Sequence, residues 1–144
     1  MANPMYGQNK FDDKIASNAK WRLSNELDLT STAGVYPVCT VPAGSYVLGV
    51  KILVTSAITA GSMDIDVGDG DNADMFIDGW DGTAGSVAVN TIIDASGSAL
   101  EAGVASGKYY AASDTIDVDI NTVAGAGKIK LLVLLAESAP VTLS

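Results

Sequence analysis

The sequence contains no histidine, the side chain most often used as a general base and the commonest zinc ligand. It has a single cysteine, Cys39, so neither an internal disulfide nor a CxxC redox site is available. Without a histidine to activate it, Cys39 is predicted to be a small buried hydrophobe rather than a nucleophile. The sequence also lacks a GxSxG motif and a complete GxGxxG motif, so we predict that the chain is not an enzyme.

Positive charge is scarce: 8 Lys and Arg residues stand against 17 Asp and Glu residues, a net charge of −9. A protein that neutralises nucleic-acid phosphates has the opposite balance, so no nucleic-acid partner is expected. The longest apolar run, residues 131–136, is far shorter than the roughly 20 residues of a membrane span. Residues 1–30 contain no apolar stretch of the signal-peptide type. We therefore expect a soluble protein, made in a cytoplasm, with no membrane partner.

What the sequence does contain is β-strand patterning in a chain of 144 residues, the length of one domain. Apolar residues alternate with others over 48–54, 63–67, 87–93 and 116–120. In the run 128–136, Ile129 and Leu131 begin one apolar face, and Leu132 and Leu134 form a second. A strand with two apolar faces is buried on both, either centrally in a sandwich or against a neighbouring subunit.

Glycine-rich turn sequences separate these runs, and no long helical pattern lies between them. The sequence therefore predicts an all-β fold: a jelly-roll-like or Greek-key β-sandwich of about seven or eight antiparallel strands. It does not decide between these two arrangements or give the order of the strands.

The first part of the chain differs from the rest in charge. Residues 1–30 carry four basic and four acidic residues, whereas residues 31–144 carry a net charge of −9. The opening segment also has few β-branched residues and no period-2 alternation. We therefore predict an extended N-terminal arm over 1–30, dispensable for the core, and a β-sandwich domain over 31–144. An ordinary first strand with a frayed end is the alternative.

Residues 64–81 hold seven aspartates and no basic residue. Ca²⁺ prefers oxygen ligands, so the weak candidates for a metal site are Asp64, Asp66, Asp69 and Asp71. The spacing does not match an EF-hand loop, because the sixth residue from Asp64 is an aspartate rather than a glycine. A solvated strand followed by an Asx-capped turn explains the same residues better. We predict no metal site and no cofactor, with at most an adventitious Ca²⁺ ion.

Aromatic residues make up only 6% of the chain, which is too few for a convincing aromatic binding surface. Trp80 could serve as a stacking platform for a sugar beside the acidic segment, but core or interface anchoring is the default for both Trp80 and Trp21. Tyr109 and Tyr110 are expected to place one ring inside the domain and one outside.

Two stretches resemble proteins of tailed-bacteriophage virions. The opening MANPMYGQNK (residues 1–10) resembles the start of small virion proteins. A Pro-Ala-Gly turn and a strand over 41–56 are followed by the sequence IDVGDGDNAD at 65–74 and by FIDG at 76–79. This order is similar to that of phage capsid decoration (cement) proteins and covers about half of the chain.

The resemblance implies a β-sandwich on the outer surface of a capsid, forming a homotrimer and bridging neighbouring subunits of the major capsid protein. The contacts with the capsid are then expected within residues 1–22. Their predicted members are three aromatic anchors and three ion partners: Tyr6, Phe11, Trp21, Lys10, Lys14 and Arg22. The alternative is a receptor- or glycan-binding fibre or spike domain on the virion, whose site would surround Trp80 and residues 64–81.

Overall fold

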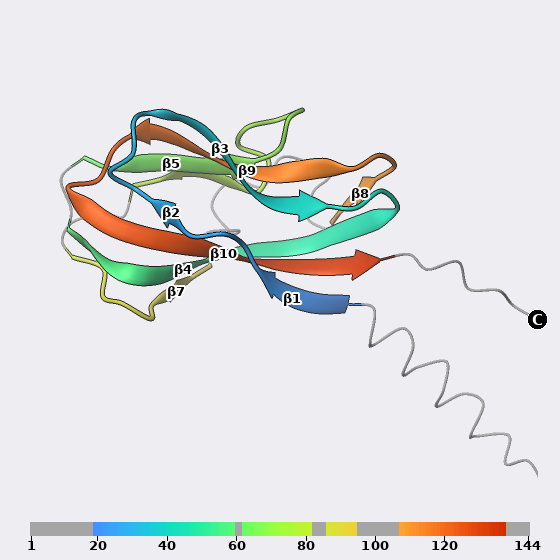
Figure 1. Ribbon diagram of the computed structural model, residues 1–144, viewed down its shortest axis with the longest axis horizontal. Helices are drawn as coiled ribbons and strands as arrows, with labels where there is room; N and C mark the ends of the chain where they lie inside the picture. Colours follow the sequence, from blue (N-terminus) through green and yellow to red (C-terminus); the bar gives the residue numbers. More distant parts are fainter. Residues whose placement is uncertain (1–18, 60–61, 82–85, 95–106, 138–144) are drawn as a thin grey trace, which may run out of the picture.

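In the computed structural model the chain is a sandwich of two antiparallel β-sheets (Figure 1). The structure describes residues 19–59, 62–81, 86–94 and 107–137. Its strands are β1 (Ala19–Leu23), β2 (Leu27–Asp28), β3 (Gly34–Val41), β4 (Ser45–Thr59), β5 (Asp64–Gly68), β6 (Ile77–Trp80), β7 (Ile92–Ile93), β8 (Lys108–Tyr110), β9 (Asp114–Thr122) and β10 (Ala126–Glu137). Among the described residues, no helix has the length and hydropathy required of a membrane span.

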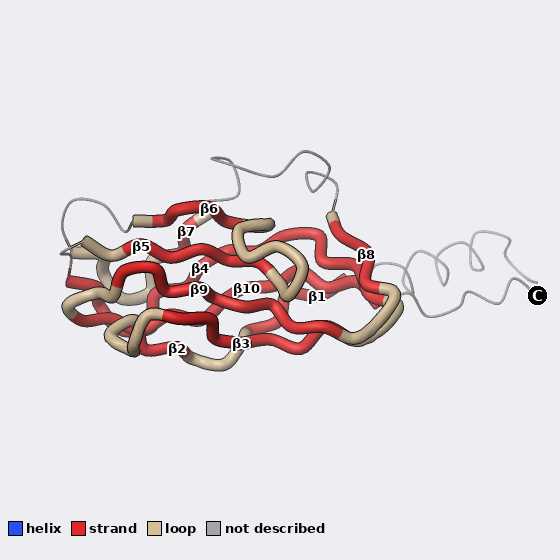
Figure 2. Tube along the Cα trace, turned by 90° about the horizontal axis from the view of Figure 1, so that it is seen from above, coloured by secondary structure: helices blue, strands red, loops and turns tan. Residues whose placement is uncertain are grey.

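The six-stranded sheet is built around β4 and β10, which pair along most of their length. Strands β1 and β2 both pair with the free side of β10, and β7 and β8 both pair with the free side of β4. The four-stranded sheet has the order β3-β9-β5-β6, and Figure 2 shows it from above. Along the chain, successive strands alternate between the two sheets, except that β1 and β2, β5 and β6, and β7 and β8 are successive strands of the same sheet. That connectivity is compatible with a jelly roll in which β1–β2 and β7–β8 are interrupted strands.

The predicted all-β sandwich is therefore confirmed. The described residues form ten strands, three of which have three residues or fewer, where the sequence predicted about seven or eight. The alternating patterns place their apolar residues in the core between the sheets. Its fully buried members include Val54, Ile58, Ile65, Val67, Ile116, Val118 and Val133.

The predicted boundary at residue 30 is wrong for residues 19–30. β1 pairs with β10, and Leu27 and Leu29 are buried in the core. The Ser24 amide donates to the Leu131 carbonyl, and the Leu131 amide donates to Ser24 Oγ. The balanced charge of this segment says nothing about burial, and its strands are too short to show a clear period of two. The predicted arm over residues 1–18 lies outside the described residues.

The run from Val87 to Ile93 is only partly a strand. Val87 forms an isolated bridge with Ile58, and the strand proper is the two-residue β7. Between them Asn90 has a φ of 69°, in the left-handed region, where a regular strand cannot continue. A tight turn therefore interrupts the alternation that predicted a continuous strand.

Candidate functional site

The acidic segment turns sharply at the end of β5. Asp69 Oδ1 accepts hydrogen bonds from the amides of Asp71 and Asn72, both at 3.0 Å. The Asp69 amide in turn donates to the Asn72 carbonyl at 2.9 Å. A Cβ atom on Gly68 would lie 2.0 Å from that carbonyl oxygen, so the turn folds back onto a position that only glycine can occupy. The predicted Asx-capped turn is confirmed.

The other oxygen of the Asp69 carboxylate has two partners on β8. Lys108 Nζ and Tyr110 Oη each lie 2.6 Å from Asp69 Oδ2. The Asp69 side chain has no exposed surface, and that of Lys108 is 20% exposed. Four donors therefore surround one buried carboxylate. This arrangement connects the β5–β6 turn to the edge of the six-stranded sheet.

The electrostatic consequences follow from this geometry. Burial alone would raise the pKa of Asp69, but the hydrogen bonds from Lys108, Tyr110 and the turn amides outweigh it and lower the pKa. Burial and the adjacent Asp69 carboxylate raise the pKa of Tyr110. For Lys108, burial works against the charged form, but Asp69 and Asp71 raise its pKa overall. At neutral pH the group is an ion pair with a hydrogen-bonded phenol.

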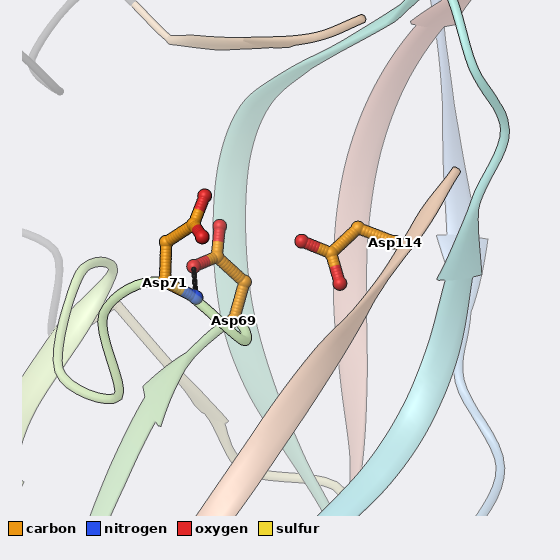
Figure 3. A group of neighbouring side chains, drawn as sticks. All are labelled: Asp69, Asp71 and Asp114. Atoms are coloured by element: carbon orange, nitrogen blue, oxygen red, sulfur yellow. Dashed lines mark hydrogen bonds between the residues drawn. The ribbon is translucent and has the colours of Figure 1, made fainter. Parts of the chain in front are cut away.

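Asp69 and Asp71 meet a third aspartate, Asp114, at the start of β9 (Figure 3). One carboxylate oxygen from each of the three lies within 4.8 Å of the others, and we call these residues the aspartate cluster. A hollow of about 330 Å³ adjoins it, and its lining includes Val35, Asp69, Asp71, Asp117 and Asp119. The Lys108 ammonium, 2.6 Å from Asp69 and 3.4 Å from Asp71, already supplies a cation to two of the three carboxylates.

The other two metal candidates lie apart from the aspartate cluster. Asp64 and Asp66 are partly exposed on β5, where the pattern predicted a solvent-facing pair. Asp66 accepts hydrogen bonds from the Gly79 amide at 2.6 Å and from Asn121 Nδ2 at 2.7 Å. These bonds hold β6 and β9 to β5. The structure thus gives Asp66, like Asp69, a role in joining strands.

Among the predicted capsid contacts, Tyr6, Lys10, Phe11 and Lys14 lie outside the described residues. Trp21 and Arg22 lie on β1, at the edge of the six-stranded sheet. Arg22 forms an exposed ion pair with Glu137 at 3.0 Å, across the adjacent strands β1 and β10.

The remaining aromatic and sulfur predictions can be compared with the structure directly. Trp80 packs against the core, as the default interpretation predicted. Tyr110 is buried and Tyr109 is half exposed, also as predicted. Cys39 is partly buried, and burial raises the pKa of its thiol, which disfavours the nucleophilic thiolate.

A surface that the sequence did not identify as a unit lies on the outside of the six-stranded sheet. Nine large hydrophobic residues are exposed among the described ones, and six of them belong to this sheet, each 42–57% exposed. We call them the apolar face: Trp21, Leu23, Tyr46, Leu48, Ile92 and Tyr109.

The apolar face is continuous across the strands. Trp21 pairs with Leu134, which pairs with Gly49, and the Trp21 ring reaches within 3.6 Å of the position of a Gly49 Cβ atom. The rings of Tyr46 and Tyr109 have centroids 4.9 Å apart. Strands β1, β10, β4 and β8 thus contribute to one surface. Leu132 and Leu134, the second apolar face predicted for their strand, are partly buried within it.

Charge is divided between the two layers of the sandwich. All six basic residues that the structure describes lie on strands of the six-stranded sheet, which carry only two acidic residues. The strands of the four-stranded sheet carry six aspartates and no basic residue over the described positions. One layer is therefore apolar on its outside and carries the basic residues, four of which form ion pairs with acidic ones, and the other layer is acidic.

No family model and no curated relative matches the chain. Solved structures do share its fold. A chain in the acidic stable capsid structure of Helicobacter pylori bacteriophage KHP30 is 17% identical, with 83% of this chain and 89% of that chain covered and a TM-score of 0.57. A chain in the capsid asymmetric unit of cyanophage Pam1 is 16% identical, with 83% of this chain and 86% of that chain covered and a TM-score of 0.52. A chain in the capsid of Ralstonia phage GP4 is 12% identical, with the same two coverages and a TM-score of 0.54. At these identities the comparison establishes that this chain has a fold found in phage capsids.

Proposed function

We propose that the chain is a structural protein of a phage virion, and specifically a capsid decoration (cement) protein that binds the outer surface of the major capsid protein shell. The observation that carries this proposal is the fold shared over 83% of the chain with chains of three phage capsid structures. The sequence resemblance to cement proteins points in the same direction. On this proposal the chain is not an enzyme and needs no cofactor.

The two-layered charge distribution supports a position on the outside of a shell. A strongly acidic layer is well solvated and suits exposure to water, whereas exposed apolar groups gathered on one layer mark an interaction surface. Trp80 is partly buried and packs against the core, which leaves less of its ring available as a platform for a glycan. We therefore favour the decoration role over the receptor-binding role.

The proposal includes the partners and contacts predicted from the sequence. The copies associate as a homotrimer, and Tyr6, Lys10, Phe11 and Lys14 contact the major capsid protein. These residues precede β1 directly, so the segment that holds them continues into Trp21 on the apolar face. Arg22 would have to exchange its ion pair with Glu137 for one with the capsid.

The proposal is tested on purified particles of the phage that encodes the chain. Quantitative mass spectrometry should find the protein at a fixed, high ratio to the major shell subunit. Analytical ultracentrifugation of the free protein should give three times the monomer mass of 14.7 kDa if it is a trimer. Absence from particles would overturn the virion assignment. A few copies per particle, located at the tail, would replace decoration with the receptor-binding role.

The contribution of the N-terminal segment is tested in the full-length chain. The double variant Tyr6→Ala/Phe11→Ala should bind undecorated shells less tightly than the wild type while keeping its melting temperature. Equal binding by the variant and the wild type would remove these two aromatic residues from the capsid contact.

A further inference from the structure

We propose that the apolar face is the surface by which the chain docks on a shell subunit, and that the matching surface of that subunit is apolar and carries a carboxylate that meets Lys130. This inference rests on the proposed function, because the partner is the shell. It assigns the described residues that make the contact and the orientation of the sandwich, with the four-stranded sheet pointing away from the shell.

The first argument is the concentration of exposed apolar side chains. Trp21, Leu134 and Gly49 form one row across three strands, Leu48 adjoins Gly49 on β4, and the Tyr46 ring contacts the Tyr109 ring at a tilted angle. A soluble protein seldom exposes large apolar residues side by side unless a partner covers them. Tryptophan and tyrosine are also the residues that contribute most to protein–protein contacts.

The second argument is the charge around this surface. Lys51 lies 5.5 Å from the centre of the Trp21 ring, and Lys130 pairs with Leu53 in the row that contains Ile92. Lys51 forms an ion pair with Asp94 and Lys128 one with Glu26, so these two charges are already compensated. Lys130 forms no ion pair with any described residue. A carboxylate on the partner would complement the charge of Lys130.

The same lysine argues against a second copy as the occupant. Two apolar faces brought together would place the Lys130 ammonium groups of both copies at one interface, and like charges at an interface are unfavourable. Packing the apolar face of one copy on the acidic layer of the next would match charges. These two surfaces lie on opposite sides of the sandwich, however, and contacts between opposite sides stack copies into an open filament, whereas the proposed homotrimer is a closed ring. A different polypeptide with an apolar centre is the occupant that satisfies both features.

The experiment measures the binding of the full-length chain to shells stripped of it. The variant Trp21→Ser/Leu48→Ser removes two exposed apolar side chains from the apolar face. The control Val35→Ser/Val123→Ser removes two exposed valines elsewhere on the sandwich, one on β3 and one just after β9. We expect the apolar-face variant to raise the Kd for shells at least about tenfold and the control to change it by less than about threefold.

Charge is tested in parallel with Lys130→Glu, which should weaken binding at low salt more than at high salt. Circular dichroism and the melting temperature show that each variant is folded.

The possible results separate the two proposals. If the wild type does not bind shells, the proposed function fails and this inference fails with it. If the wild type binds and the apolar-face variant binds equally well, the decoration role stands and the docking surface is wrong. A variant that loses its trimer but keeps shell binding would show that a second copy covers the face. One that melts several degrees lower as an isolated monomer would show that the chain's own segments cover it. Both results would overturn the inference.

Discussion

Replacing Asp69 by asparagine tests whether the buried ion pair holds the β5–β6 turn to β8. The variant keeps an oxygen that can accept the two turn amides, but it places an NH2 group against Lys108 Nζ, which can only donate, and against Tyr110 Oη, which donates to the carboxylate in the wild type. The carboxylate that now lies 2.6 Å from each of these atoms is lost. Lys108 retains one carboxylate partner, Asp71 at 3.4 Å, and its contact with the Tyr110 ring, whose centre lies 4.8 Å from Nζ.

The expected cost can be worked out from the burial of the partners. Removing one member of a buried pair costs about 3–5 kcal/mol, because the other charge is left uncompensated. Lys108 is 20% exposed and can recover some hydration, which favours the lower end, about 3 kcal/mol. For a chain of this size that corresponds to a fall in melting temperature of about 9 °C. The control Asp71→Asn, on a side chain that is 81% exposed, should cost less than about 1 kcal/mol.

The pH dependence supplies a sharper test of the same residue. The pKa of Asp69 is lowered in the folded state, so its contribution is fully present above the pKa of the unfolded chain, about 3.9, and is lost as the pH falls through the folded pKa. Urea denaturation should therefore separate the wild type from Asp69→Asn at pH 7, and the difference should shrink below about pH 4. A difference of less than 0.5 kcal/mol at pH 7, or one that does not vary with pH, would refute the reasoning.

Three further predictions concern the turn, the aspartates and the core. Gly68→Ala should destabilise the protein by at least about 2 kcal/mol, because its Cβ atom would meet the turn backbone at 2.0 Å, while Gly70→Ala, with its nearest contact at 3.6 Å, should be tolerated in the same urea titration. Millimolar Ca²⁺ should move the melting temperature by less than about 1 °C, because the Lys108 ammonium already pairs with two of the three carboxylates in the aspartate cluster; a rise of several degrees would restore a metal site. In chemical denaturation Leu131→Ala should cost about 2–5 kcal/mol and Leu132→Ala less than about 1 kcal/mol, since the two residues face opposite sides of β10; equal losses would contradict that assignment.

The fold was predictable from sequence wherever a strand has one buried face. Ile116 and Val118 alternate with polar residues, and the structure buries both of them. The alternating pattern does not predict strands that are only two or three residues long. β2 has two residues, so the burial of Leu27 and Leu29 depends on pairing with a strand about 100 residues later, which no local pattern reports.

For the aspartates, too, local interactions were predictable from the sequence and long-range ones were not. The Asx turn at Asp69 was predictable, because its hydrogen bonds join residues two and three positions apart. The ion pair was not, because Lys108 and Tyr110 lie 39 and 41 residues further along the chain. The local sequence contains seven acidic residues and no basic one, whereas the fold brings the basic residue Lys108 to Asp69 from β8. The acidic segment therefore resembled a metal site more in the sequence than it does in the structure.

The charge division between the two sheets depends on topology in the same way. In the printed sequence the basic residues of 19–137 are scattered among acidic ones, and only the net charge is visible. Because the chain alternates between sheets, β5, β6 and β9 assemble their aspartates on one layer while β1, β4, β8 and β10 assemble the lysines and Arg22 on the other. A net charge of −9 thus conceals the fact that every described basic residue lies in one layer, the same layer that carries the exposed Trp21. Net charge argues against nucleic acid as a partner, but it could not indicate which side of the protein meets another molecule. The distribution of charged and exposed apolar residues over the two layers indicates that side. The comparison of Trp21→Ser/Leu48→Ser with Val35→Ser/Val123→Ser tests whether the apolar face is the side that meets the shell.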